Sequence, residues 1–195
     1  MRLVVLGAAA GGGFPQWNCG CDNCAAARAG DPTAAPRTQD ALAARVDGGS
    51  LLVNASPDVA QQIRATPALW PARARATPVR GAVLTNGDLD HVLGLFSLRE
   101  SSPLVVFATA AVRRGLEDNA MLRTLRRFDG QLRFAPLELD REVDAFGVGL
   151  TAFALPGKLP KHLEGHAPPS DEDNVGLELR FADGRRAVVA SSAGA

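Results

Sequence analysis

One segment, residues 79–100, constrains the fold of this chain more than any other part of its sequence. Residues 80–84 are typical of a buried strand, residues 85–88 are typical of a turn, and residues 90–99 space their apolar side chains as a helix does. A strand that leads through a short turn into a helix is the building unit of α/β proteins. The sequence therefore predicts an α/β fold.

Polar side chains gather where this strand becomes a helix. Asp88, Asp90 and His91 lie within four residues of one another. Proteins of the α/β class place ligands at the carboxyl ends of their strands, and a carboxylate beside an imidazole is half of a metal site. The same aspartates are equally suited to capping the helix, with His91 in solvent. These residues alone leave both interpretations open.

Further elements are indicated on both sides of this segment. Residues 2–6 are typical of a buried strand, and Asp47-Gly48-Gly49 is a hairpin turn between strands at 41–45 and 50–53. We expect a helix from Pro57 to Ala65 with Ser56 as its N-cap, and another at about 110–128.

The cysteines form one cluster. Cys19, Cys21 and Cys24 lie within six residues and no cysteine occurs elsewhere, unlike the spread pattern of a disulfide framework. Thiolates at this spacing converge on a borderline cation such as Zn²⁺, because the intervening Gly, Asp and Asn residues let the chain turn around the ion. The sequence predicts a structural zinc whose fourth ligand is not identified. Unligated thiols or a redox-active pair are the alternatives.

Composition and charge exclude several classes of protein. The chain has 21 basic and 21 acidic residues, so it lacks the positive charge of a nucleic-acid-binding protein. Its apolar stretches are shorter than the ~18 residues of a membrane span, and residues 1–6 do not form a secretory signal. The glycine-rich turn at 7–13 lacks a phosphate-binding motif. We therefore expect a cytoplasmic protein without a bound nucleotide.

Several longer sequence segments carry a family resemblance. These are residues 7–19 (GAAAGGGFPQWNC), 37–39 (RTQ), 54–58 (NASPD), 90–100 (DHVLGLFSLRE) and 173–177 (DNVGL). In this order they closely resemble the coenzyme PQQ synthesis protein B family, which lies within the metallo-β-lactamase superfamily. The resemblance implies an αββα sandwich.

The resemblance also bears on the metal. In the H-x-H-x-D-H segment of the superfamily, Asn86 and Asp88 stand where the first two histidines would be, whereas Asp90 and His91 are retained. Two imidazoles of the usual zinc site are therefore missing, which disfavours a zinc-hydroxide hydrolase. The resemblance instead implies an Fe(II) site ligated by Asp90 and His91, with Asp88 as a further catalytic residue that orients His91 or a water. A second imidazole is expected beyond Ala195.

The implied role is the biosynthesis of pyrroloquinoline quinone (PQQ), a redox cofactor built from a Glu and a Tyr of a precursor peptide. Members of the family have been regarded as non-haem iron hydroxylases of that tyrosine or as carriers that move PQQ or its precursor to the periplasm, so enzymatic activity is left open. Expected partners are the precursor peptide or its Glu-Tyr product, PQQ, and a second copy of the chain in a homodimer.

The chain is short for this fold. Residue 195 lies about two-thirds of the way through the sandwich that the resemblance implies. We therefore expect residues 1–195 to form a single metallo-β-lactamase-like domain that is incomplete and lacks its C-terminal portion.

Overall fold

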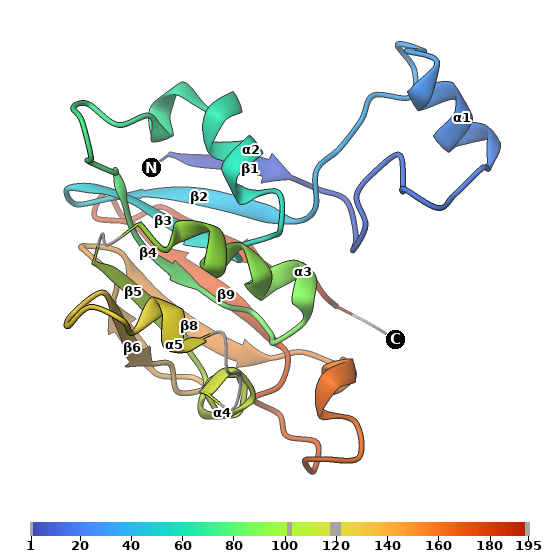
Figure 1. Cartoon of the computed structure of the whole chain (residues 1–195). Coiled ribbons are helices and arrows are strands. Elements are labelled where there is room, and N and C mark those ends of the chain that lie inside the picture. The colour runs from blue at the N-terminus through green and yellow to red at the C-terminus, as the bar shows by residue number, and fades with distance from the viewer. Residues whose placement is uncertain (1, 101–102, 118–121, 194–195) are drawn as a thin grey trace.

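The computed structural model describes residues 2–100, 103–117 and 122–193, and two β-sheets organise them (Figure 1). The larger sheet contains, in spatial order, β1 (Leu3–Gly7), β2 (Ala41–Val46), β3 (Gly49–Val53), β4 (Val79–Val83), β5 (Leu104–Ala108) and β6 (Leu132–Pro136). The first three strands are antiparallel and the remaining pairs are parallel. The predicted hairpin is confirmed, with Leu42 opposite Val53.

The smaller sheet is antiparallel. Its spatial order is β10 (Arg186–Val189), β9 (Val175–Arg180), β8 (Gly149–Ala154) and β7 (Glu142–Asp144). It packs on one face of the larger sheet, and side chains alternate between two cores because successive residues of a strand point to opposite faces. In β3, Leu51 and Val53 point toward the smaller sheet, whereas Leu52 points away from it.

Helices cover the other face of the larger sheet (Figure 1). The described residues thus form three of the four predicted layers. The helical segments are α1 (Asp22–Arg28), α2 (Val59–Ala65), η1 (Pro67–Leu69), α3 (Leu89–Val92), η2 (Leu93–Leu98), α4 (Ala110–Glu117), α5 (Leu122–Leu125) and η3 (Lys161–Leu163). Two belong elsewhere: α1 lies at the end of an arm that extends away from both sheets, and η3 lies in the connection between β8 and β9.

The prediction of Ser56 as a helix N-cap was wrong. Helix α2 begins at Val59 rather than at Pro57, and residue 58 occupies the cap position. Ser56 is fully buried, and its hydroxyl donates a hydrogen bond to Oε1 of Gln62 (3.2 Å). The hydroxyl is therefore engaged by a side chain instead of by the free amides at the helix start.

The helix predicted at 90–99 is also altered. Only α3 is α-helical, and η2 continues it as a 3₁₀ helix. A close backbone approach accompanies this change, since Gly94 N–H donates to the carbonyl of Ala55 (2.8 Å). Of the helix predicted at 110–128, α4 and α5 are observed, and residues 118–121 lie outside the described residues.

A methyl group at position 94 is expected to destabilise the protein. A Cβ atom there would lie 2.1 Å from the carbonyl oxygen of Ser56, so two backbone segments would have to separate. The Gly94→Ala substitution should therefore lower the free energy of unfolding by about 1–3 kcal/mol, as overpacking does elsewhere. Urea unfolding measures the change. Gly20→Ala is the control because a Cβ at Gly20 meets open space, and equal stability of the two variants would contradict the prediction.

Candidate metal centres

His91 lies in α3, directly after the carboxyl end of β4, and is buried. Its Nδ1 lies 3.2 Å from Oγ1 of Thr85. The main-chain N–H and the hydroxyl of Thr85 both donate to Oδ1 of Asn54, each at 3.0 Å. The imidazole is thus held in place by side chains from the ends of two neighbouring strands, β3 and β4.

A residue that sequence reasoning missed, Asp40, faces the other side of this imidazole. Its Oδ2 lies 4.0 Å from Nε2 of His91 and accepts a hydrogen bond from Nδ2 of Asn54 (2.9 Å). The predicted hairpin contained the signal that could have found it. Because Leu42 pairs with Val53, the residues before β2 lie beside those after β3.

The two aspartates of the predicted site lie on either side of the start of α3. Asp88 is at the N-cap position, but its side chain makes no capping hydrogen bond. Burial, followed by the negative charge of Asp90, raises the pKa of Asp88 above its ordinary value. The carboxylate of Asp90 lies against the glycine-rich turn, where a Cβ at Gly11 would be 3.3 Å from its Oδ2.

These three predicted residues do not meet in a compact triad. Over the described ranges, the one group of three or more His, Cys, Asp or Glu side chains whose ligand atoms lie within 4.8 Å of one another is formed by the cysteines. Within the described residues, the site at α3 is therefore a half-site. His91 and Asp40 face each other across a gap, and the carboxylate of Asp90 lies near Gly11.

The cysteine cluster is preformed. Ligand atoms of Cys19, Cys21 and Cys24 all lie within 4.8 Å of one another, and the three side chains range from exposed to buried. Arg28, in the last turn of α1, donates to the carbonyls of Cys19 (2.6 Å) and Gln16 (2.5 Å) and so closes the loop.

The thiols of this cluster differ electrostatically. Hydrogen bonds from the backbone of Cys24 and from the side chain of Cys19 lower the pKa of Cys21. A backbone hydrogen bond at Gln16 acts to lower the pKa of Cys24, but burial and the two neighbouring thiols outweigh it and raise that pKa. Three sulfurs within 4.8 Å of one another suit a tetrahedral zinc with one further position.

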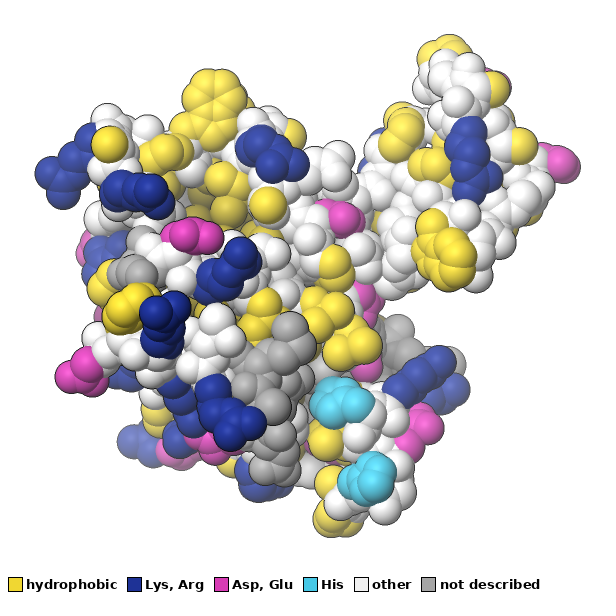
Figure 2. All heavy atoms as spheres, viewed as in Figure 1, with side chains coloured by type: hydrophobic (Ala, Val, Ile, Leu, Met, Phe, Trp, Pro, Cys, Tyr) yellow, Lys and Arg dark blue, Asp and Glu magenta, His cyan; other side chains and the backbone are white. Residues whose placement is uncertain are grey.

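A pocket of about 600 Å³ opens beside Asp88. Asn86 and Asn174 line it, and Nδ2 of Asn174 donates to the carbonyls of Pro156 (3.1 Å) and Ser192 (2.8 Å). Lysine side chains at 158 and 161 also line the pocket, and both are exposed. Figure 2 shows histidine side chains on the surface of the neighbouring segment between β8 and β9.

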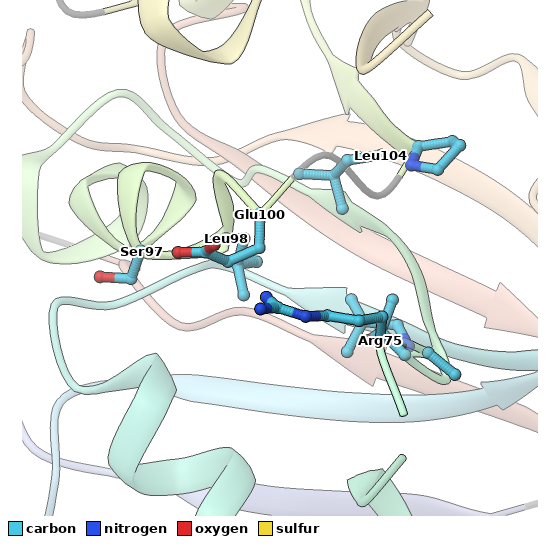
Figure 3. A pocket seen from close by; sticks show the side chains of 9 residues that line it. Arg75, Ser97, Leu98, Glu100 and Leu104 are labelled. Atoms are coloured by element: carbon cyan, nitrogen blue, oxygen red, sulfur yellow. Dashed lines mark hydrogen bonds between the residues drawn. The ribbon is translucent and has the colours of Figure 1, made fainter. Parts of the chain in front are cut away.

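A smaller pocket, of about 190 Å³, lies at the opposite end of the larger sheet, where β4 and β5 begin (Figure 3). The side chains of Arg75 and Glu100 extend toward each other across it. The described residues that line it include neither histidine nor cysteine. This pocket is therefore separate from both candidate metal centres.

Comparison with known proteins places the fold in a family. Residues 50–194 match the family model described as a beta-lactamase superfamily domain. The chain belongs to this superfamily. The predicted metallo-β-lactamase fold is thereby confirmed. A diphosphatase of the PhnP family, 19% identical with a TM-score of 0.65, shares the fold.

Closer relatives carry the name coenzyme PQQ synthesis protein B, which confirms the predicted resemblance. The protein of Rhizobium meliloti (strain 1021) is 46% identical over 194 residues, covering 95% of this chain and 62% of the relative. That of Methylobacterium sp. (strain 4-46) is 44% identical and covers 97% and 64%. The crystal structure of Zn(2+)-bound PqqB from Methylobacterium extorquens is 38% identical with a TM-score of 0.88, covering 96% and 64%. The chain thus spans under two-thirds of the length of these relatives.

Over residues 2–100, 103–117 and 122–193, no helix has the length and apolar character that crossing a bilayer requires.

Proposed function

We propose that this chain is part of a protein of PQQ biosynthesis that hydroxylates the tyrosine of a Glu-Tyr precursor with non-haem Fe(II). The observation that carries the proposal is the buried His91, whose Nε2 faces a carboxylate in a chain 46% identical to a coenzyme PQQ synthesis protein B. Imidazole and carboxylate are the ligands of non-haem Fe(II) sites that keep positions open for O₂ and substrate.

The side chains at the start of α3 are of the kinds that such a metal takes as ligands. Asp90 and His91 would hold it, and the hydrogen bond between Nδ1 of His91 and Oγ1 of Thr85 supplies the outer partner that metal-bound imidazoles require. Asp88, between this site and the pocket, would orient a water or the substrate. Bound Fe(II) would supply the activation of O₂. The cysteine cluster would bind a separate structural zinc.

The oxygen atoms, electrons and protons of the proposed reaction balance. One atom of O₂ enters the ring C–H bond next to the tyrosine hydroxyl, and the other atom leaves as water. Two electrons and two protons come from an external reductant such as ascorbate. The chain's contribution is to bind the peptide in the pocket beside Asp88 with the ring facing the metal.

The pocket supplies groups that suit an acidic substrate. Lys158 and Lys161 are the only lysines of the chain, and both line this pocket. An ammonium group on a flexible stem pairs readily with a carboxylate. The glutamate of a Glu-Tyr peptide, or the carboxylates of PQQ, would be held there.

Removing one of these charges should weaken substrate binding. Lys161→Ala is expected to raise the KM for a Glu-Tyr peptide about tenfold, because one exposed charge-assisted hydrogen bond to the substrate is lost. Steady-state kinetics measures this. Lys161→Arg, which keeps the charge, should fall close to the parent, and Arg73→Ala, in the exposed segment before β4, is the remote control. An unchanged KM in Lys161→Ala would contradict the role.

The experiment that tests the activity is anaerobic loading with Fe(II), followed by isotopically labelled O₂, ascorbate and a Glu-Tyr peptide. Because the chain spans under two-thirds of its relatives, it is assayed alone and joined to the C-terminal remainder of the Rhizobium meliloti relative. A catechol that contains oxygen from O₂ is expected. Its absence in both forms would contradict the proposal.

A carrier that moves PQQ or its precursor to the periplasm is the second candidate. The lysine-lined pocket favours it, because such a pocket binds carboxylates without any redox chemistry. A carrier would bind PQQ equally well with and without Fe(II), whereas the hydroxylase needs the metal. The cytoplasmic location and the homodimer remain predictions from the sequence.

A further inference from the structure

We propose that Asp40 is a metal ligand, so that one divalent cation is bound between Oδ2 of Asp40 and Nε2 of His91. This inference rests on the proposed metal at His91 and adds a ligand that neither the sequence motifs nor the resemblance indicates.

The gap between the two atoms has the size of a shared cation. At 4.0 Å it is too long for a hydrogen bond, which joins nitrogen and oxygen at about 2.7–3.2 Å. An ion bound at about 2.0–2.2 Å to each of two ligands separates them by about 3.4 Å at a tetrahedral angle and by up to about 4.4 Å when they lie opposite each other, so a gap of this length fits an ion with the two ligands on nearly opposite sides. A direct charged pair would be expected to close to about 2.8 Å. The two side chains thus face each other without forming a direct hydrogen bond.

The hydrogen bonds around Asn54 orient both ligands toward this gap. The main-chain N–H of Thr85 can only donate, so it fixes Oδ1 of Asn54 on its own side and turns Nδ2 toward Asp40. Oδ2 of Asp40 accepts this one hydrogen bond and keeps lone-pair capacity for an ion. One buried amide thus sets the position of the carboxylate.

The same amide sets the tautomer of His91. Because the hydroxyl of Thr85 donates to Oδ1 of Asn54, its oxygen accepts from Nδ1 of His91. The proton of the neutral imidazole then resides on Nδ1, and Nε2 presents a free lone pair toward Asp40. This is the arrangement in which an outer partner prepares a histidine for metal binding.

Burial favours an ion over a solvated gap. The His91 side chain is 5% exposed and that of Asp40 is 22% exposed. Each side chain has one hydrogen-bond partner, and a cation between Oδ2 and Nε2 would compensate the negative charge of Asp40 and take up the lone pair of His91 that faces it. Oxygen and nitrogen ligands of this kind suit Fe(II), Mn(II), Co(II) or Zn(II).

The test uses this chain with its cysteine cluster first saturated with zinc. Co(II) is then titrated anaerobically into the parent and into Asp40→Asn, which keeps an oxygen to accept the hydrogen bond from Asn54. We expect Asp40→Asn to bind Co(II) at least about tenfold more weakly, since loss of even an outer partner costs this much. Asp31→Asn, at an exposed aspartate, is the matched control.

A second variant reports coordination directly. Asp40→Cys should add a thiolate-to-Co(II) charge-transfer band in the near ultraviolet that the zinc-saturated parent lacks. If Asp40→Asn binds Co(II) like the parent, or if it binds more weakly but Asp40→Cys shows no band, Asp40 is not a ligand. If His91→Ala also binds Co(II) like the parent, the metal at His91 fails and the proposed function with it.

Discussion

Replacing His91 with alanine is expected to remove the affinity of the chain for Fe(II) and to leave one equivalent of zinc on the cysteines. His91 supplies the one buried imidazole of the described residues. The cysteines are the one group of three metal-ligating side chains found there, so no such group replaces His91 at this site. Equilibrium dialysis under anaerobic conditions, followed by metal analysis, measures both metals in the same sample.

His162→Ala is the matched control, because His162 is exposed in the segment that borders the pocket. It should bind Fe(II) like the parent. If His91→Ala retained Fe(II) at parental affinity, α3 would hold no metal, and the hydroxylase proposal would lose its anchor.

Replacing Cys21 with serine is expected to abolish stoichiometric zinc binding and to unfold the arm that carries α1. Small structural zinc sites gain on the order of 10 kcal/mol from the metal, and this arm extends away from both sheets (Figure 1). Hydrogen exchange should therefore rise at residues 16–28, while the two sheets keep their protection.

Asn23→Ser provides the control for this experiment, because Asn23 lies between two of the cysteines and is not among the grouped ligands. It should keep its zinc. A Cys21→Ser variant that still holds a full equivalent of zinc would contradict the assignment of the cluster.

Features encoded by neighbouring residues could be predicted from the sequence. The Asp47-Gly48-Gly49 turn fixed the pairing of its two strands, because such a turn joins adjacent antiparallel strands in one way. The cysteine cluster also follows from spacing alone, since residues five apart on a turning chain cannot lie far from one another.

Features that depend on distant contacts were missed. Serine is a residue type that often caps helices, but the hydroxyl of Ser56 donates a hydrogen bond to Gln62 instead. Residues 93–98 have helical spacing, but the contact of Gly94 with Ala55 accompanies a 3₁₀ conformation there. Asp40 lies 51 positions before His91 in the sequence; the pairing of β2 with β3 and of β3 with β4 brings their segments together, and the hydrogen bonds of Asn54 connect them.

We propose that this chain holds two different metals, zinc on the cysteines and Fe(II) at His91. Anomalous X-ray scattering from a crystal prepared anaerobically with both metals, recorded at the zinc and iron absorption edges, tests it directly. We expect a zinc peak among Cys19, Cys21 and Cys24 and an iron peak beside Nε2 of His91, on the side that faces Asp40. A crystal with zinc on the cysteines and no iron peak at His91 would contradict it.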